Sequence, residues 1–324
     1  MKKLLIVCMS CQDEFFIEQE KVIKETWAGP IIKGEYPGVD FLIYKGDETL
    51  EKHKLIKSQN TLLLRCEDDL DHTFKKTYYA LSLIDKNFEY DYIFRTNTST
   101  FVNVPLMYEL IHNLDNDEVA WFSELYSLSE AYTPYPLCLF GRGNGMLLSR
   151  KLVKRILVEG INFVYYGRCD DWVIGNILNS YWFKQGKDYT EYIKSYKHGW
   201  FKCISTDADN SHTLCSYYND NTNFNFLKQF VTIQIKRYNE RHLENANYYE
   251  LWDVFSKNKD TDLQDEVDSN LIYSTDSNVF IGSILGYIPL TKWKSIDKGK
   301  LYALEINNKA YDDAEFFKNK KPIF

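Results

Sequence analysis

A short polar turn follows one of the buried strands that the sequence predicts. In "DYIFRTNTSTFVNV", residues 91–104, an apolar run ends at Asn97, Thr98 and Ser99. Many enzymes place metal-binding carboxylates at such a strand end, because a hard divalent cation prefers charged oxygen ligands. These three side chains offer only neutral amide and hydroxyl oxygens. The turn therefore predicts hydrogen bonding to a ligand and no structural metal.

Two adjacent carboxylates, Asp170 and Asp171, begin a second segment of interest. "CDDWVIGNILNSYW", residues 169–182, repeats apolar residues at the spacing of one helical face. Aspartates suit the start of a helix, since Asp170 can cap it while Asp171 faces the positive end of the helix dipole. From the pair alone, capping is the favoured interpretation.

Three glycines in five residues, Gly141, Gly143 and Gly145, precede this helix in the chain. Glycine allows a backbone to pass close to a ligand. Arg142 lies inside this loop, and Arg95 lies two residues before Asn97, on the same face of the predicted strand. The cations nearest these segments in sequence are Arg95, Arg142, Lys197, His198 and His212.

Strand and helix signals alternate through the first two-thirds of the chain. Strands are predicted at residues 3–9, 39–46, 61–66, 90–96, 118–125 and near 278–285 and 300–306. Helices are predicted at 13–27, 71–84, 106–114, from 149, at 169–182 and at 226–256. This rhythm predicts an α/β fold with a mainly parallel central sheet and helices on both faces. Ligands bind beyond the carboxyl ends of such strands. Cys8–Cys11 and Asn97–Ser99 both lie at predicted carboxyl ends, and the loops Cys8–Ser10 and Arg95–Ser99 should form one cleft.

Composition excludes several classes of protein. The 324 residues are 44% hydrophobic and 16% aromatic, which is enough to bury a core. A net charge of −7 argues against a nucleic-acid binder. No run approaches the roughly 20 apolar residues of a membrane helix, and the short run at 4–9 is predicted to be a strand and not a signal peptide.

The seven cysteines are scattered and odd in number, which favours free thiols in a reducing cytosol and predicts a cytoplasmic location. Cys8-x-x-Cys11 has no second such pair, so zinc is not expected, and a plain strand end is favoured over a redox site. After Lys257 the composition becomes polar and linker-like. The predicted division is a first domain at residues 1–258 and a C-terminal extension at 259–324.

Four segments, in order, resemble motifs of the β-1,3-galactosyltransferase and Fringe-like glycosyltransferases. "IKETW" (23–27) is similar to "IRxTW", "DYIFRTNTSTFVNV" to "DFxxKxDDDTFVNV", "YPLCLFGRGNGMLLSRKLVKRI" to "YPxYCxGxGYxLSxDLVxxI", and "CDDWVIGNIL" to "EDVYVGxCL". The ordered set spans residues 23–178. The resemblance implies a GT-A fold, which is Rossmann-like. It also implies inverting transfer of a sugar from a uridine diphosphate (UDP) sugar to a glycan or glycolipid hydroxyl.

The resemblance also assigns roles to residues. The aspartates that hold the donor ribose and manganese in the family fall on Asn97, Thr98 and Ser99, so no Mn²⁺ or Mg²⁺ is expected, and cationic side chains, first Arg95 and Arg142, should meet the diphosphate. With the glycine loop at the family's spacing, Asp171 is favoured as the catalytic base over a cap. The implied donor site is Cys8, Met9, Ser10, Arg95, Asn97, Thr98, Ser99, Arg142, Gly143 and His212, and the implied acceptor site is Asp170 and Trp172.

Other functions stay open at this point. A catalytically inactive relative that binds nucleotide or glycan is the alternative, although retention of Asp171 favours an enzyme. A nucleotidyltransferase is disfavoured because no P-loop and no GxGxxG follow the first strand.

Several residues have simpler interpretations. Trp121 is expected in the core. His212 falls where the family often has a histidine near the metal, and an ordinary surface position is equally expected for it. Lys75 and Lys76 are expected on a solvated helix face, and Asp68 and Asp69 in a turn or cap.

Overall fold

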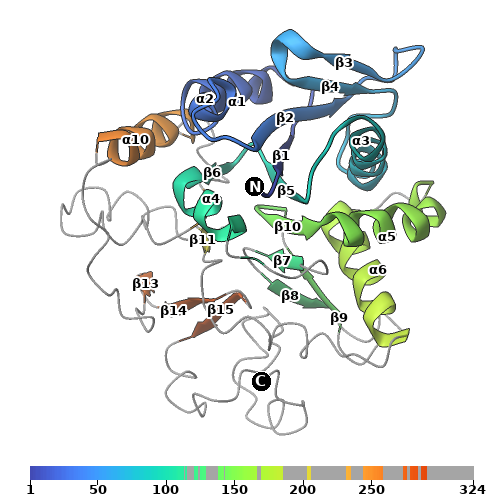
Figure 1. Ribbon diagram of the computed structural model, residues 1–324. Helices are drawn as coiled ribbons and strands as arrows, with labels where there is room; N and C mark the ends of the chain where they lie inside the picture. The colour runs from blue at the N-terminus through green and yellow to red at the C-terminus, as the bar shows by residue number, and fades with distance from the viewer. Residues whose placement is uncertain are drawn as a thin grey trace, which may run out of the picture.

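The structure is a computed structural model. It describes residues 1–112, 114, 120–122, 125–128, 138–141, 143–165, 169–184, 203–205, 231–234, 244–257, 273–275, 278–283 and 286–289. A seven-stranded sheet in the order β3-β4-β2-β1-β5-β10-β7 forms its centre (Figure 1). The strands are β1 (Leu4–Met9), β2 (Val39–Gly46), β3 (Lys54–Ile56), β4 (Thr61–Leu64), β5 (Tyr92–Asn97), β7 (Ala120–Phe122) and β10 (Met146–Ser149). The neighbours β4, β2, β1 and β5 are parallel, which confirms the predicted α/β fold with a mainly parallel sheet.

Helices cover both faces of the sheet. Figure 1 shows one group on each side. The first group is α1 (Glu14–Glu25), α2 (Gly29–Ile32), α4 (Val104–His112) and α10 (Glu244–Lys257), and the second is α3 (Thr73–Asn87), α5 (Arg150–Gly160) and α6 (Asp170–Lys184).

Side chains point alternately to the two faces of the sheet along each strand, and each face has its own hydrophobic core. In β1, Leu4, Ile6 and Cys8 pack towards α1, α2, α4 and α10. Leu5 and Val7 pack towards α3, α5 and α6. A strand that is buried on both faces must be apolar throughout, which explains the unbroken run "LLIVCM".

The order of strands reverses beside β1. From β1 the chain moves to β2 and then to β4 on one side, and β5 then pairs with β1 on the other side. Met9 is level with Tyr44 of β2 and with Asn97 of β5. Ligands in open α/β sheets bind at such a reversal, beyond the carboxyl ends of the strands. The topology therefore places a candidate site at the ends of β1 and β5.

Most predicted elements in the first half are confirmed within one to four residues, including the N-cap of α1, where the Phe15 amide donates to Asp13 at 2.9 Å. One prediction was wrong. Residues 231–234 were assigned to a helix, but β12 (Thr232–Gln234) pairs with β6 (Thr100–Val102), because Val231 and Ile233 alternate into the core. The strand predicted at 118–125 contains β7, and its last residue begins β8 (Leu125–Leu128).

Strand β10 was missed. Its run "MLLS" is fully buried, and periodicity does not distinguish so short an apolar run from a helix. Ser149 precedes α5, as expected, but makes no side-chain cap.

The remaining strands form small sheets. β11 (Cys203–Ser205), β12 and β6 form one, β8 and β9 (Cys138–Gly141) a second, and β13 (Tyr273–Thr275), β14 (Asn278–Ser283) and β15 (Gly286–Pro289) a third. The strand expected near 278–285 is confirmed as β14, and residues 300–306 lie outside the described residues. The last sheet falls within the predicted extension, whose boundary stays a prediction. Within the described part of the chain, no helix has the length and apolar character to cross a membrane.

Candidate active site

Four side chains, Arg95, Tyr44, Thr77 and Asp170, form a closed ring of polar contacts near the carboxyl ends of β2 and β5. Arg95 of β5 forms an ion pair with Asp170 at 2.7 Å, and its Nε donates to the Tyr44 hydroxyl at 3.3 Å. Tyr44 lies 2.9 Å from Thr77 Oγ1, which donates to Asp170 Oδ2 at 2.8 Å. The proton directions agree around the ring, since Arg95 donates to Tyr44, Tyr44 to Thr77, and both Thr77 and Arg95 to Asp170. A fully satisfied buried network of this kind fixes its members in place.

The same arginine also holds the glycine loop. Arg95 Nη1 donates to the Gly143 carbonyl. A Cβ on Gly143 would lie 2.6 Å from Arg95 Nη1 and 3.5 Å from Asn97 Nδ2, so only glycine lets the loop approach this closely. Three of the four sequence motifs, the β5 turn, the glycine loop and the start of α6, thus meet at one guanidinium group.

Burial and pairing define what Arg95 and Asp170 can do. Their side chains are only 1% and 4% exposed. Burial lowers the pKa of Arg95, but the Asp170 carboxylate, Tyr44 and Asp171 outweigh it and leave that pKa above its ordinary value. This geometry differs from the expectation that Arg95 meets a diphosphate and Asp170 an acceptor. Each charge is already matched by the other, and what the pair holds is the start of α6 against β5.

Tyr44 is neutral in this ring. The pKa of its hydroxyl is raised to about 12, mainly by burial and also by Asp170, and this is after the lowering by Arg95. A protonated Tyr44 is what the ring requires, because the hydroxyl must donate to Thr77.

The polar turn is organised by the amide of Asn97. Its Oδ1 accepts from the Ser99 amide at 3.1 Å, Ser99 Oγ at 2.9 Å and Thr100 Oγ1 at 2.9 Å. Thr98 and Ser99 are buried, whereas Asn97 is half-buried. Tyr248 of α10 donates to the Thr98 carbonyl, which ties the turn to that helix. Of these three residues, Asn97 is the most accessible.

A divalent metal does not fit the side chains of this turn. The only Asn97 oxygen is occupied by hydrogen bonds, and hydroxyl oxygens supply no charge. In the described part of the chain, no three His, Cys, Asp or Glu side chains are grouped to hold a metal ion.

Asp171 and Trp172 begin α6 beside the ring. Asp171 is half-buried and its Oδ1 accepts from the Trp172 amide at 2.7 Å. Its negative charge helps to raise the pKa of Arg95. Trp172 is half-buried and packs partly against the core, so stacking on a sugar is not its sole role. Asp170 pairs with Arg95 and accepts from Thr77, so its carboxylate acts as an ion-pair partner.

The residues expected at the end of β1 differ in accessibility. Cys8 is fully buried, and burial raises the pKa of its thiol above the ordinary range. Ser10 is buried and donates to Glu20 at 2.6 Å, and Lys45 also binds Glu20, at 2.9 Å. Met9 is half-buried with its sulfur 3.4 Å from Arg95 Nη2. Of the expected trio, Met9 is the most accessible.

A second buried ion pair, Lys76–Asp68, lies near these strand ends and was not predicted from the sequence. Lys76 was expected in solvent, but it is 3% exposed and donates to Asp68 at 2.6 Å and to the Ser10 carbonyl at 2.9 Å. Asp68 also accepts from the Gly46 and Gln12 amides. The loops after β1, β2 and β4 are therefore joined. The signal was available, because Thr73 and Ala80 flank Lys76 at i−3 and i+4 on the buried face of α3.

Several predicted residues lie outside the described residues: Arg142, Lys197, His198 and His212. For Trp121 only its place in β7 is described.

Comparisons with known proteins give likeness in structure and none in sequence. No protein-family model matches the chain, and no curated protein matches it. A crystal structure of a glycosyltransferase involved in the glycosylation of the major capsid of PBCV-1 matches 76% of this chain and 98% of its own chain, with 11% sequence identity and a TM-score of 0.38. A match at this TM-score does not assign a family.

Proposed function

We propose that this protein is an inverting GT-A glycosyltransferase that moves a sugar from a UDP-sugar to a hydroxyl of a glycan or glycolipid. The observation that carries the proposal is the convergence at Arg95. The β5 turn, the glycine loop and the Asp170–Asp171 segment resemble glycosyltransferase motifs in sequence, and all three contact or flank this guanidinium at the strand-order reversal.

In the proposed reaction Asp171 is the general base. The acceptor oxygen attacks the anomeric carbon as its proton passes to a carboxylate oxygen of Asp171, and the nucleoside diphosphate leaves from the opposite face. The new glycosidic bond then has inverted configuration. Arg95 and Asp170 act as positioning residues, because their ion pair fixes the first turn of α6 from which Asp171 projects.

Neutral hydrogen bonds hold the donor ribose in this proposal, with Asn97 as the contact from the turn. The diphosphate charge needs a cation, since negative charge develops on the leaving group. Arg142 is the proposed cation, because it precedes Gly143 in the chain and arginine binds phosphate oxygens in pairs. Because the turn lacks charged ligands, transfer should persist in EDTA.

The first test is a thermal-shift screen of UDP and a panel of nucleotide sugars, with and without Mn²⁺. A ligand that binds the native state raises the unfolding midpoint by mass action. UDP or a UDP-sugar should raise it without metal. If no nucleotide raises it under either condition, the proposal is wrong.

The second test addresses Asp171. With the best donor, Asp171→Asn should lower turnover by roughly 10²–10⁴-fold and leave donor affinity unchanged. Asp40→Asn is the matched control, since Asp40 is exposed near the start of β2, at the opposite edge of the sheet. Retention of more than a tenth of wild-type turnover by Asp171→Asn would reject the base assignment.

The inactive-relative alternative gives a different pattern. It predicts that a nucleotide or glycan raises the unfolding midpoint while neither transfer nor donor hydrolysis occurs, and that Asp171→Asn changes nothing.

A further inference from the structure

The outward face of α5 and of the 3₁₀ turn that follows it, η3 (Ile161–Phe163), carries basic side chains followed by exposed apolar ones. Lys151, Lys154, Val158 and Ile161 follow one another at spacings of three and four residues, so they share one face, and Tyr165 follows in the turn after η3. The two lysines are exposed, and Val158, Ile161 and Tyr165 are 66%, 46% and 82% exposed. We call these five residues the α5 stripe.

The opposite face of α5 is committed to the core. Leu152, Val153 and Ile156 are fully buried under the sheet. The helix therefore needs no outward apolar residues to fold. Exposed Val, Ile and Tyr side chains in a row remain unexplained by folding, and contiguous exposed apolar surface marks an interaction site.

The charge of α5 contrasts with that of the chain. The helix carries four basic residues and one acidic residue, whereas the whole chain has a net charge of −7. Arg150 already contacts Asp85 and Tyr90, and Arg155 contacts Glu159 and Tyr181. Lys151 and Lys154 are both exposed, so both lysines of the stripe present their charge to solvent.

We propose that the α5 stripe docks on an anionic lipid surface. Lysines attract anionic headgroups, and the row of exposed apolar side chains enters the headgroup region, which is the pattern of helices that lie in a membrane interface. The acidic residues elsewhere oppose this weakly, because charges beyond the Debye length of about 8 Å at physiological salt are screened.

The orientation of the helix gives the docking a consequence for the site. β10 is antiparallel to β5, so α5 begins near the amino end of β5. The last residue of α5, Gly160, lies against Phe74 near the start of α3, beside Thr73. Tyr165 is five residues before Asp170, which is held to Thr73 and Arg95 at the site. The apolar end of the stripe is therefore the end that leads to the site. If the proposed function is also right, the acceptor hydroxyl is presented at the lipid surface; the docking itself does not depend on that reaction.

The test is flotation of the full chain with vesicles. One set is phosphatidylcholine alone, and the other is equal parts phosphatidylcholine and phosphatidylglycerol. The wild type should float with the anionic vesicles only and dissociate as salt is raised. Lys151→Gln with Lys154→Gln should weaken binding about 25-fold, since each lysine near an anionic surface contributes about a factor of five. Ile161→Ser with Tyr165→Ser should also weaken it.

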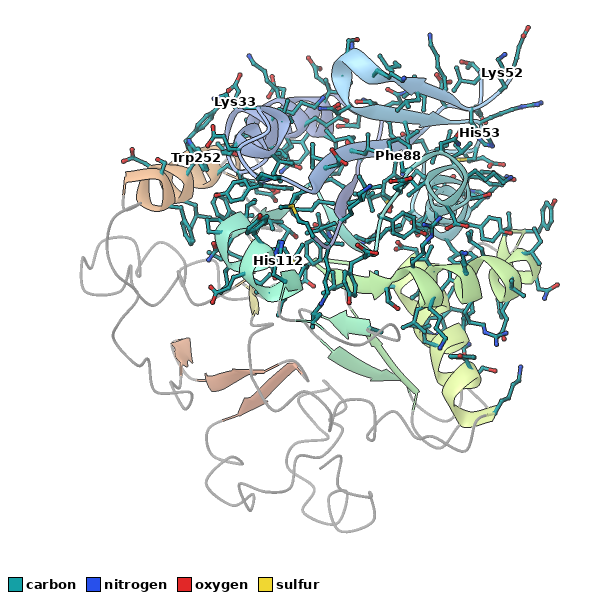
Figure 2. The ribbon with its side chains drawn as sticks, in the orientation of Figure 1. Lys33, Lys52, His53, Phe88, His112 and Trp252 are labelled. Atoms are coloured by element: carbon teal, nitrogen blue, oxygen red, sulfur yellow. The ribbon has the colours of Figure 1, made fainter. Side chains whose placement is uncertain are left out.

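Two matched variants at another exposed site provide the control. Ile32 is 43% exposed and Lys33 is exposed, and Figure 2 shows Lys33 on the side of the molecule away from α5. Ile32→Ser and Lys33→Gln should leave vesicle binding unchanged. All variants are surface substitutions, and unchanged unfolding midpoints verify that they fold.

Three results would overturn the proposal: no flotation of the wild type, equal flotation with neutral vesicles, or α5 variants that bind as well as the wild type. Absence of flotation would instead point to a protein partner for this face. Because flotation needs no sugar donor, failure of the proposed transfer reaction would leave this result unaffected.

Discussion

The Arg95–Asp170 ion pair allows a demanding test of how this site is built. Asp170→Ala would leave a guanidinium that is 1% exposed without its carboxylate. Arginine cannot escape by losing its proton, because its pKa stays above 12. Removal of one partner of a buried pair costs about 3–5 kcal/mol, whereas an exposed pair contributes little. Asp170→Ala should therefore destabilise the fold by about 3–5 kcal/mol in urea unfolding at neutral pH. Glu89→Ala, which breaks the exposed Lys3–Glu89 contact, should have no measurable effect.

A second version of the experiment exchanges length between the partners. The family motifs that this sequence resembles have Lys where the chain has Arg95 and Glu where it has Asp170. The Arg–Asp pair of this chain joins a longer cationic side chain to a shorter carboxylate. A Lys–Glu pair joins a shorter cationic side chain to a longer carboxylate and can span the same distance. Arg95→Lys and Asp170→Glu should each destabilise by about 1–3 kcal/mol, through lost hydrogen bonds and overpacking respectively. The double variant should recover part of this, with a coupling energy of about 1–3 kcal/mol.

The assay is a double-mutant cycle measured by urea denaturation and followed by circular dichroism. Additive effects within about 0.5 kcal/mol would mean that the two side chains do not interact. If Asp170→Ala also proved as harmless as Glu89→Ala, the ring would not exist in solution, and the positioning argument for Asp171 would fail with it.

Three further predictions concern the same region. Gly143→Ala should destabilise by about 1–3 kcal/mol in the same urea assay, because its Cβ would lie 2.6 Å from a buried guanidinium nitrogen. Tyr44, with its pKa raised to about 12, should stabilise fully below pH 10 and lose that contribution as pH rises towards 12, since the unfolded phenol then binds fewer protons than the folded one. Tyr44→Phe should therefore reduce the fall of unfolding free energy by about 1.4 kcal/mol per pH unit in that window. Alkylation followed by mass spectrometry should label Cys169 before Cys8 and Cys66, because Cys169 is exposed whereas the other two are buried.

The sequence was sufficient to predict which strand ends lie side by side. Short apolar runs that each end in polar residues define parallel strands, and the carboxyl ends of such strands meet at one edge. The prediction that Cys8–Ser10 and Arg95–Ser99 come together follows from this rule, and Met9 is indeed level with Asn97.

The roles of individual charges could not be predicted in the same way. Arg95 was taken for a ligand cation because the sequence gives its strand face but not its partner, which lies 75 positions later at Asp170. Lys76 was placed in solvent because lysine is usually exposed, although its carboxylate partner Asp68 makes burial possible. Ion pairs between distant segments leave no periodic signal, and only the three-dimensional contacts reveal them.

The ring at Arg95 has a consequence for how the chain is made. The parallel strands β4, β2, β1 and β5 are all complete by residue 97, so on the ribosome they are available long before the rest. Arg95 cannot enter its buried position at that stage, because an unpaired charge in the core is prohibitively costly. Its carboxylate partner leaves the ribosome only after Asp170 has been synthesised, several seconds later at about 5–20 residues per second. The sheet around β5 therefore closes late, and it closes in the same step that assembles the candidate active site.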